Sequence, residues 1–515
     1  MLPEIAYSLA DTKEGCKTLL VIHENREFPL HSRFYPTHEQ ELYREKFDPE
    51  KYDFLVVLGT GLGYHLLSLK EKITRYSGIV LIDVLDGIQD EIARNEFTSF
   101  LASSGNVEFL TAQMPDRVEQ RLTNAIDMND IRGITVVEHE SSVRIFSEYY
   151  SEIKKIIEKI INKKAQNRAT QSAFSLRYVK NIVKNLKALN DAIPVKKLFG
   201  RFEQYPCVII VPGPSLDRSI DVLGKNAGKY FIISVDSALP VLAGNGIEPD
   251  FLVSIDPQPF VYEHTTGIAT DAVRVFSLSS YSEPSCFRYS AVSLNTHPLS
   301  QIVSSLTRDG IGSIDSSTGT VAGDAISMGV KLGFRAIGLL GFDFSFLDHV
   351  IYARGSAYQR RFATLFQNRY HPAESQNIHY IRKSSRGFMH SGRHTRRAFI
   401  QYKDSIEGII DKYKIQNKNI NIYNINARGL AIQGVNETPL NLFIKNECGS
   451  HIEKNDLIRG IITKSEKAEG IIPLKECKKI LLDPNVFHEA ITSSFGKEPD
   501  ERIMIKISRL IDNLF

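Results

Sequence analysis

Three short apolar runs in the middle of this chain constrain its fold more than any other feature. They cover residues 207–211, 230–235 and 250–255, and helix-compatible segments separate them. An unbroken apolar run of this length is typical of a strand that is covered on both faces, as in a parallel sheet. Strands that alternate with helices in this way predict an α/β fold built from βαβ units.

A polar turn follows each of these runs. The first run leads into Gly213, Pro214 and Ser215, and the other two are followed by Asp236 and Asp256. Ser215 is predicted to cap the next helix, whose free N–H groups would suit a phosphate. Because ligands of open α/β sheets bind outside the carboxyl ends of the strands, we expect all three turns to reach one crevice.

A second group of polar residues lies further along the chain. Thr318, Gly319 and Thr320 precede a helix of small residues, and the apolar run 336–340 leads to Asp343. A helix start of this kind is a second candidate cradle for a phosphate or a nucleotide. The small helix residues indicate close packing on the sheet, and Asp343 is a third carboxylate at a strand end.

The N-terminal part contains a glycine-rich turn between two further apolar runs. Residues 53–58 lead into the sequence GTGLG, and the run 78–82 ends at Asp83. This order is close to a βαβ unit that binds a nucleoside or dinucleotide, in which the acidic residue binds ribose hydroxyls. The standard third glycine is absent, so a simple tight turn without a ligand is the alternative interpretation.

The length of 515 residues exceeds what one hydrophobic core supports, so several domains are expected. Between residues 141 and 189 there is no proline or glycine and the apolar spacing is helical, with a break predicted near 162–168. We therefore predict a multi-domain α/β protein with four parts: a Rossmann-like domain (1–140), a helical connector (141–195), a central doubly wound domain (196–436) and a C-terminal helical domain (437–515).

Composition excludes several classes of protein. A net charge of +3 does not favour nucleic acid as a partner, and no apolar run is long enough for a membrane span. The five cysteines are scattered without metal-site spacing, which fits a reducing cytoplasm. We expect a cytoplasmic protein without a membrane span.

Several motifs occur together in an order that points to one family. The sequence contains PGPSLD, SVDSAL, PDFLVSIDPQP and GTVAGDAISMGVKLGFRAIGLLGFDFSF. With these motifs the whole chain resembles the motility accessory factor (Maf) flagellin glycosyltransferases. Its central part is similar to the bacterial sialyltransferases that use CMP-sialic acid, which implies a sialyltransferase-like (GT-A-like) domain.

The resemblance implies a reaction and its partners. A nonulosonic acid of the pseudaminic, legionaminic or sialic type would pass from a CMP-activated donor to serine or threonine hydroxyls of flagellin. This modification would be needed for flagellum assembly and motility. No cofactor is implied as a requirement, a divalent metal stays possible, and the oligomeric state is left open.

The resemblance also assigns roles to individual residues. The turn at Gly213–Ser215 would hold the nucleotide, and the segment Thr318–Thr320 would lie near cytidine and phosphate. Asp236 and Asp256 stand where the sialyltransferases have asparagines that contact CMP and the donor sugar. The hydrogen-bond donors of those asparagines cannot be carried over to carboxylates.

The leaving group and the acceptor need further residues. Tyr352 matches one of two tyrosines that bond the departing phosphate, whereas Ser345 stands at the other position. Because negative charge grows on the phosphate, Tyr352, Arg354 and nearby helix N–H groups are predicted to stabilise it without a metal. The acceptor hydroxyl needs a base of near-neutral pKa, for which His390 and His394 are equal candidates.

Two other functions stay open from the sequence alone. Asp236, Asp256 and Asp343 could hold Mg²⁺ and a pyrophosphate in an enzyme like a pterin pyrophosphokinase. Alternatively, the chain could be a non-catalytic flagellin-binding chaperone with a decayed nucleotide site. The long segment 352–391 is predicted to be loop-like, with a short helix allowed within it, and to close over the donor as a lid.

Overall fold

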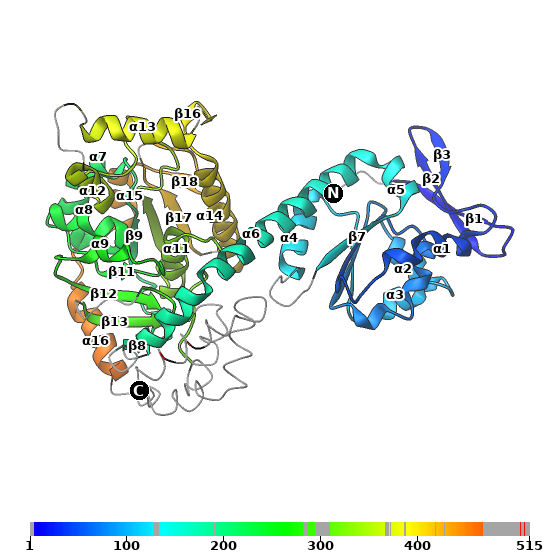
Figure 1. Ribbon diagram of the computed structural model, residues 1–515, viewed down its shortest axis with the longest axis horizontal. Helices are drawn as coiled ribbons and strands as arrows, with labels where there is room; N and C mark the ends of the chain where they lie inside the picture. The colour runs from blue at the N-terminus through cyan, green and yellow to red at the C-terminus, as the bar shows by residue number, and fades with distance from the viewer. Residues whose placement is uncertain are drawn as a thin grey trace. The chain divides into compact units, whose positions relative to one another are not determined.

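The chain forms two compact units, Met1–Gln171 and Ser172–Phe515, and the division falls inside helix α6 (Ser147–Asn185) (Figure 1). The protein is described from a computed structural model. The described residues are 5–126, 133–186, 188, 192–281, 287–294, 310–365, 370, 372–385, 388–417, 419–426, 428–466, 505 and 509.

Two sheets build the N-terminal unit. One is antiparallel, in the order β1-β2-β3, and the other is parallel, in the order β6-β5-β4-β7. The order of the parallel sheet confirms the Rossmann-like prediction, with a topological switch point between β4 and β7. The strands are β1 (Tyr7–Asp11), β2 (Lys17–His23), β3 (Arg26–Pro29), β4 (Phe54–Leu58), β5 (Gly78–Asp83), β6 (Val107–Thr111) and β7 (Ile134–Glu138).

Asp83, which the sequence pattern assigned to ribose binding, holds the glycine-rich turn after β4. Asp83 Oδ2 accepts hydrogen bonds from the N–H groups of Thr60 at 2.6 Å and Gly61 at 3.0 Å, and from the Thr60 hydroxyl at 2.8 Å. A short 3₁₀ segment, η3 (Tyr64–Leu69), follows in place of a long α-helix. These contacts favour the tight-turn interpretation, because Asp83 is buried and already bonded.

A nine-stranded sheet organises the second unit, and all of its strands are parallel. Their order is β18-β17-β14-β9-β10-β11-β12-β13-β8. The strands are β8 (Ala192–Pro194), β9 (Pro206–Ile210), β10 (Phe231–Val235), β11 (Phe251–Val253), β12 (Thr270–Ser277), β13 (Phe287–Ser293), β14 (Ala336–Leu340), β17 (Asn421–Asn424) and β18 (Asn436–Glu437).

The strand order places a topological switch point between β9 and β14. The chain runs from β9 outward to β13 and then returns to β14 on the other side of β9. In a doubly wound sheet the crevice outside the carboxyl ends of such neighbours is the usual ligand position. The predicted turns after β9, β10 and β11 therefore share the same edge.

Helices cover both faces of this sheet. A side chain on Gly329 of α11 (Val321–Leu332) would contact Ile337 of β14, which confirms the close packing predicted from small residues. Gly338 follows Ile337 in β14, so a side chain there would project from the opposite face of the sheet. It would contact Phe443 of α15 (Leu440–Glu447). Helix α16 (Lys454–Glu466) packs near β8, so the described C-terminal segment is helical as predicted.

Two expectations about the secondary structure are wrong. Helix α6 continues for 39 residues through the break predicted near 162–168, because nothing there interrupts the helical ladder. The segment predicted as a loop-like lid contains two helices, α12 (Ala357–Leu365) and α13 (Ala373–Ser385). Among the described residues, no helix combines the length and the apolar character that a membrane span needs.

Two asparagines of α6 tie the helix to the carboxyl edge of the large sheet. The Asn181 amide donates to the carbonyl groups of Pro257 at 3.0 Å and Ser279 at 2.9 Å. The Asn185 amide donates to those of Leu278 and Ser280, both at 2.9 Å. Both side chains are buried, so each satisfies two carbonyl groups that lack access to water.

We expect Asn181→Ala to lower the free energy of unfolding by about 1–3 kcal/mol, because two buried carbonyl groups lose their donor. Asn419→Ala is the matched control, since Asn419 is exposed and should change stability by less than about 0.5 kcal/mol. Calorimetric unfolding of both variants measures the difference. An unchanged midpoint in Asn181→Ala would show that water replaces the amide at this edge.

Candidate functional site

Two glycines bring the backbones of β9 and β14 together at the switch point. A Cβ atom on Gly213 would overlap the carbonyl oxygen of Gly341, and it would lie 2.6 Å from Asp343 Oδ2. A Cβ atom on Gly341, which has a φ of +84°, would overlap the carbonyl oxygen of Val211. Only glycine fits this close approach at either position.

Ser215 and Asp343 form the centre of this edge. The Ser215 N–H donates to Asp343 Oδ2 at 2.7 Å, at the start of α7 (Leu216–Lys225). Ser215 stands at the N-cap position, but its hydroxyl donates to Asn426 Oδ1 at 3.2 Å instead of capping the helix. The prediction of a Ser215 cap is therefore wrong, because a tertiary partner takes the hydroxyl.

Asp343 occupies the position where the sequence predicted a bound anion. Burial raises its pKa to about 6, against the lowering effects of the Ser215 hydrogen bond and the charges of Arg393 and Arg428. Within the described part of the chain, Asp343 Oδ1 and Asn426 Nδ2 are both buried and have no hydrogen-bond partner. A ligand phosphate would have to share the Ser215 N–H with this carboxylate.

A second polar group lies at the ends of β10 and β11. Asp236 Oδ1 lies 3.3 Å from Nδ1 of His264, a residue of α9 (Val261–Thr265). Burial lowers the pKa of His264, but the hydrogen bond and charge of Asp236 and the charge of Asp256 outweigh it, so the net shift is upward. Asp236 Oδ2 is buried and unpaired among the described residues. This pair resembles the orienting carboxylate and base of many catalytic sites.

Asp256 and Asp324 extend this group. Asp256 Oδ1 accepts a hydrogen bond from the Gln258 N–H at 2.8 Å, and burial raises its pKa, with the charge of Asp236 adding to the effect. Asp324 lies in the first turn of α11. Burial raises its pKa to about 8, and the charge of Asp256 contributes. Asp324 therefore carries a proton at neutral pH.

The predicted phosphate cradle at the start of α11 is a compact capped turn. Thr320 is the N-cap residue, and its hydroxyl accepts a hydrogen bond from the Gly323 N–H at 3.1 Å. The Thr318 hydroxyl donates to the Thr320 carbonyl at 3.3 Å, and Gly319 has a φ of +68°. The hydroxyl groups thus hold the turn, and the helix start brings Asp324 toward Asp256.

We expect Asp324→Asn to stabilise the protein in a pH-dependent way. An unfolded aspartate ionises near a pKa of about 3.9, whereas folded Asp324 ionises near about 8. Between these values only the unfolded chain is ionised at this position, so the aspartate makes stability fall as pH rises. Asparagine cannot ionise and removes this loss.

The gain in the free energy of unfolding should be near zero at about pH 4 and on the order of 3 kcal/mol at about pH 8. The second value is set below what the full pKa shift would give at roughly 1.4 kcal/mol per pKa unit. Unfolding midpoints at the two pH values measure it, with Asp221→Asn on the exposed face of α7 as the control. A gain of equal size at both pH values would contradict a raised pKa for the buried Asp324 carboxyl.

Tyr352 and Arg354 lie beside the turn that follows β9. The Ala353 N–H donates to the Pro212 carbonyl at 2.8 Å, which fixes this segment to the turn. Tyr352 packs in an apolar cluster, with its ring 5.1 Å from that of Tyr358, and burial raises its pKa. Arg354 is exposed, and its N–H donates to Asp217 Oδ1 at 2.9 Å. The Arg354 guanidinium is exposed near the start of α7, with its Nε 3.9 Å from Asp217 Oδ2.

Ser345, which stands where the resemblance suggested a tyrosine, holds the turn after β14. Its hydroxyl donates to the Asp343 carbonyl at 3.1 Å, and the residue is buried.

The two candidate histidines lie on a short hairpin and do not point the same way. The strands are β15 (Met389–His390) and β16 (Arg393–His394), with His390 paired with Arg393 and Met389 with His394. Directly opposed residues share a face of a hairpin, so the two histidines lie on opposite faces. Arg393, which shares a face of the hairpin with His390, carries a charge that lowers the pKa of Asp343.

A hollow of about 440 Å³ opens beside α9 and α12. Two arginines, Arg360 and Arg361, contribute positive charge to it, and Glu263 next to His264 lies on its wall. A hollow of this size can hold part of a small ligand. Neither Asp236 nor His264 is among the residues that line it.

Three residues of this site were missed at the level of sequence. Asp324 carried a signal, because it is the single acidic residue in a helix of small and apolar residues. His264 carried none, since a histidine eight residues after a strand-end aspartate is not a motif. Asn426 also gave no signal, and its contacts to Ser215 and Gly341 depend on strand order.

Three comparisons relate this chain to known proteins. A family model described as 6-hydroxymethylpterin diphosphokinase MptE-like matches residues 180–349. An uncharacterized protein of Treponema pallidum (strain Nichols) is 34% identical over 89 residues, which span 17% of this chain and 41% of that protein's length. The structure of the MAf glycosyltransferase from Magnetospirillum magneticum AMB-1 aligns with a TM-score of 0.53 at 14% identity, over 100% of this chain and 87% of that chain.

The chain therefore has the fold of that MAf glycosyltransferase, and the resemblance predicted from the motifs is confirmed for the architecture. The segment matched by the family model includes the turn after β9, the strand-end aspartates and Asp343. Asn426, Tyr352, Arg354 and the hairpin histidines lie outside the matched segment.

Proposed function

We propose that this protein is a glycosyltransferase that moves a nonulosonic acid from its CMP-activated form to serine or threonine hydroxyls of flagellin. One observation carries the proposal: the buried Asp236 carboxylate and the half-buried His264 form a pair at the carboxyl edge of a sheet with the fold of a MAf glycosyltransferase. In this proposal the reaction takes place in the cytoplasm and needs no cofactor.

His264 would act as the general base. Asp236 accepts the Nδ1 proton of His264, so the other ring nitrogen, Nε2, is left to accept the proton of the acceptor hydroxyl. The acceptor oxygen then forms a bond to the anomeric carbon, while the bond from that carbon to the phosphate oxygen breaks. CMP leaves with the electron pair, and His264 keeps the proton.

The departing phosphate would meet positive charge and hydrogen-bond donors near the switch point. Arg354 and Arg393 flank the turn after β9 and Asp343, and Tyr352 lies next to Arg354 in the chain. Donors aimed at the growing negative charge lower the barrier without a metal ion. His390, on the face of Arg393, is the second candidate base, and His394 on the opposite face is the third.

Nucleotide binding tests the donor class. Calorimetry should show CMP binding at least about tenfold tighter than AMP or GMP, a difference of about 1.4 kcal/mol. Binding of CMP should tighten from about pH 8 to pH 6, because Asp343 loses its charge over this range and stops competing with the phosphate. Absence of CMP binding at about 1 mM would contradict the proposed donor.

A second function is favoured by the matched family description. Asp236, Asp256 and Asp343 could hold Mg²⁺ for diphosphate transfer to a hydroxymethylpterin. Against this, Asp343 Oδ2 already accepts the Ser215 N–H at 2.7 Å and Asp236 Oδ1 lies 3.3 Å from His264 Nδ1, so two of the three carboxylates have partners within the protein. Formation of a pterin diphosphate from ATP, Mg²⁺ and 6-hydroxymethylpterin would establish this alternative. Flagellin binding without nucleotide binding would instead indicate the chaperone.

A further inference from the structure

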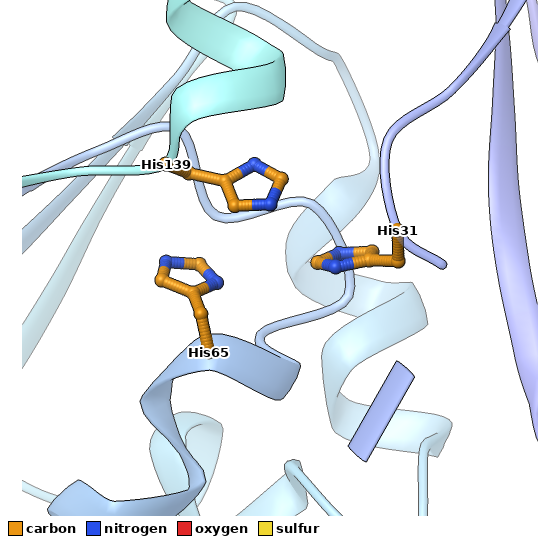
Figure 2. A group of neighbouring side chains, drawn as sticks. All are labelled: His31, His65 and His139. Atoms are coloured by element: carbon orange, nitrogen blue, oxygen red, sulfur yellow. The ribbon is translucent and has the colours of Figure 1, made fainter. Parts of the chain in front are cut away.

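Three buried histidines of the N-terminal unit point toward a common space (Figure 2). His31 lies two residues after β3, His65 lies in η3, and His139 is the first residue after β7. One ring nitrogen of each lies within 4.8 Å of the others. Since His65 and His139 follow β4 and β7, the cluster stands at the switch point of the parallel sheet, where ligands of such sheets bind.

The glycine-rich turn after β4 is shaped around these histidines. A Cβ atom on Gly61 would overlap His31 Nε2, and one on Gly59 would overlap the Ser142 side chain and lie 3.3 Å from His139 Cβ. Both glycines also have positive φ values, +80° and +45° for Gly59 and Gly61. The GTGLG sequence therefore makes room for the histidine cluster, which is a different use from holding a dinucleotide.

A half-buried carboxylate completes the group. Glu39 Oε2 lies 2.7 Å from His31 Nδ1 and 3.8 Å from His139 Nε2, and Oε1 accepts the Ser32 N–H at 2.7 Å. In the described part of the chain, Glu39 lies within ion-pair distance of these two histidines and of no lysine or arginine.

His65 is fully buried within this cluster. Neither ring nitrogen of His65 has a hydrogen-bond partner among the described residues. An unpaired buried imidazole is unfavourable, and a ligand in the cluster would satisfy it.

Outer contacts orient the rings of His139 and His31. His139 Nδ1 lies 2.8 Å from the Ser142 hydroxyl, which leaves Nε2 on the side of Glu39. His31 Nε2 accepts the Leu62 N–H at 2.8 Å, so the ring proton is on Nδ1, which donates to Glu39 Oε2 at 2.7 Å. Such outer hydrogen bonds orient the ligands of metal sites, here His139 through Ser142 and Glu39 through His31.

We propose that His139 Nε2, one nitrogen of His65 and a Glu39 oxygen bind a divalent transition metal of the Zn²⁺ class, with His31 Nδ1 as the hydrogen-bond donor that holds Glu39. Two imidazoles and one carboxylate are a donor set that suits Zn²⁺, with a water molecule at the fourth position, and the charge of the ion balances that of Glu39. The rings of His65 and His139 stack with centroids 4.5 Å apart. The ion would tie the segment that follows β3 to those that follow β4 and β7.

Cobalt titration of the full-length, untagged protein tests the site. After chelator treatment, the chain should bind one equivalent of Co²⁺ with the visible absorption of four-coordinate cobalt, and Zn²⁺ should displace it. His65→Ala should weaken Co²⁺ binding by at least about 100-fold. The milder Ser142→Ala variant, which removes only the outer partner of His139, should weaken it by about 10–100-fold. His451→Ala, at an exposed histidine of the other unit, is the matched control.

Two outcomes would overturn the proposal. One is that the wild-type chain shows no saturable four-coordinate Co²⁺ spectrum, which needs no variant to be folded. The other is that Ser142→Ala and His65→Ala bind Co²⁺ as the wild type does. In either case the histidines form a packed polar core without a metal. Zn²⁺ should also raise the melting temperature of the wild type, since a ligand that binds only the folded state stabilises it.

Discussion

Replacing His264 by alanine is expected to lower the rate of sugar transfer by about 10²–10⁴-fold, the range for loss of a general base. The reason is local: His264 is half-buried, lies 3.3 Å from the Asp236 carboxylate and has a pKa raised by that partner despite burial. The measurement is the rate of CMP release at saturating donor and acceptor. His379→Ala is the matched control, because His379 is exposed on α13 and should keep the wild-type rate.

The pH profile separates a base from a merely structural histidine. A base works when neutral, so the rate should rise with pH through a pKa above the usual value of about 6.5. Asp236→Asn removes the charge that raises this pKa, so the rise should move to lower pH while the maximal rate falls. A rate kept by His264→Ala but lost by His390→Ala would contradict the assignment and move the base to the hairpin.

Gly213→Ala is expected to lower the free energy of unfolding of the larger unit by about 3 kcal/mol or more. The added methyl group would overlap the Gly341 carbonyl oxygen and press on Asp343, and both belong to a buried crossing of two strands. Backbone atoms cannot move aside as a flexible side chain can. Differential scanning calorimetry, which resolves the two units, measures the change.

Gly244→Ala is the matched control for this substitution. Gly244 lies at the end of α8 (Leu239–Gly244), and a Cβ atom there would meet nothing within 4 Å. Alanine favours the helix over glycine by about 1 kcal/mol, so this variant should be neutral or slightly more stable. Equal midpoints for Gly213→Ala and Gly244→Ala would show that the switch point relaxes, contrary to the close packing that we describe.

The central strands of the two parallel sheets could be read from the sequence, because their side chains are buried on both faces and leave unbroken apolar runs, whereas β8, β13 and β18 were not predicted. The run 336–340 coincides with β14, and the runs ending near Asp236 and Asp256 coincide with β10 and β11 within a few residues. Strand order could not be read in this way. The return of the chain from β13 to β14 creates the switch point, and no local pattern records that step.

The candidate site was predictable only in part, since its contacts are long-range. Ser215 has the composition of a helix cap, but Asp343 and Asn426, which are 128 and 211 residues away in sequence, take its N–H and its hydroxyl. His264 gains its role from Asp236, 28 residues earlier. The GTGLG sequence is compatible with a turn that binds a nucleotide and with a turn that packs against histidines. The position of His31 against Gly61 distinguishes the two interpretations, and the sequence does not show it.

The central claim is tested most directly by the intact mass of flagellin. Unglycosylated flagellin would be incubated with the protein and a verified CMP-nonulosonic acid, with His264→Ala in a parallel reaction. The account predicts that flagellin gains the mass of one or more nonulosonic acid residues with the wild type, and far less with the variant. An unchanged flagellin mass with a donor of verified integrity and a folded wild-type protein would contradict it.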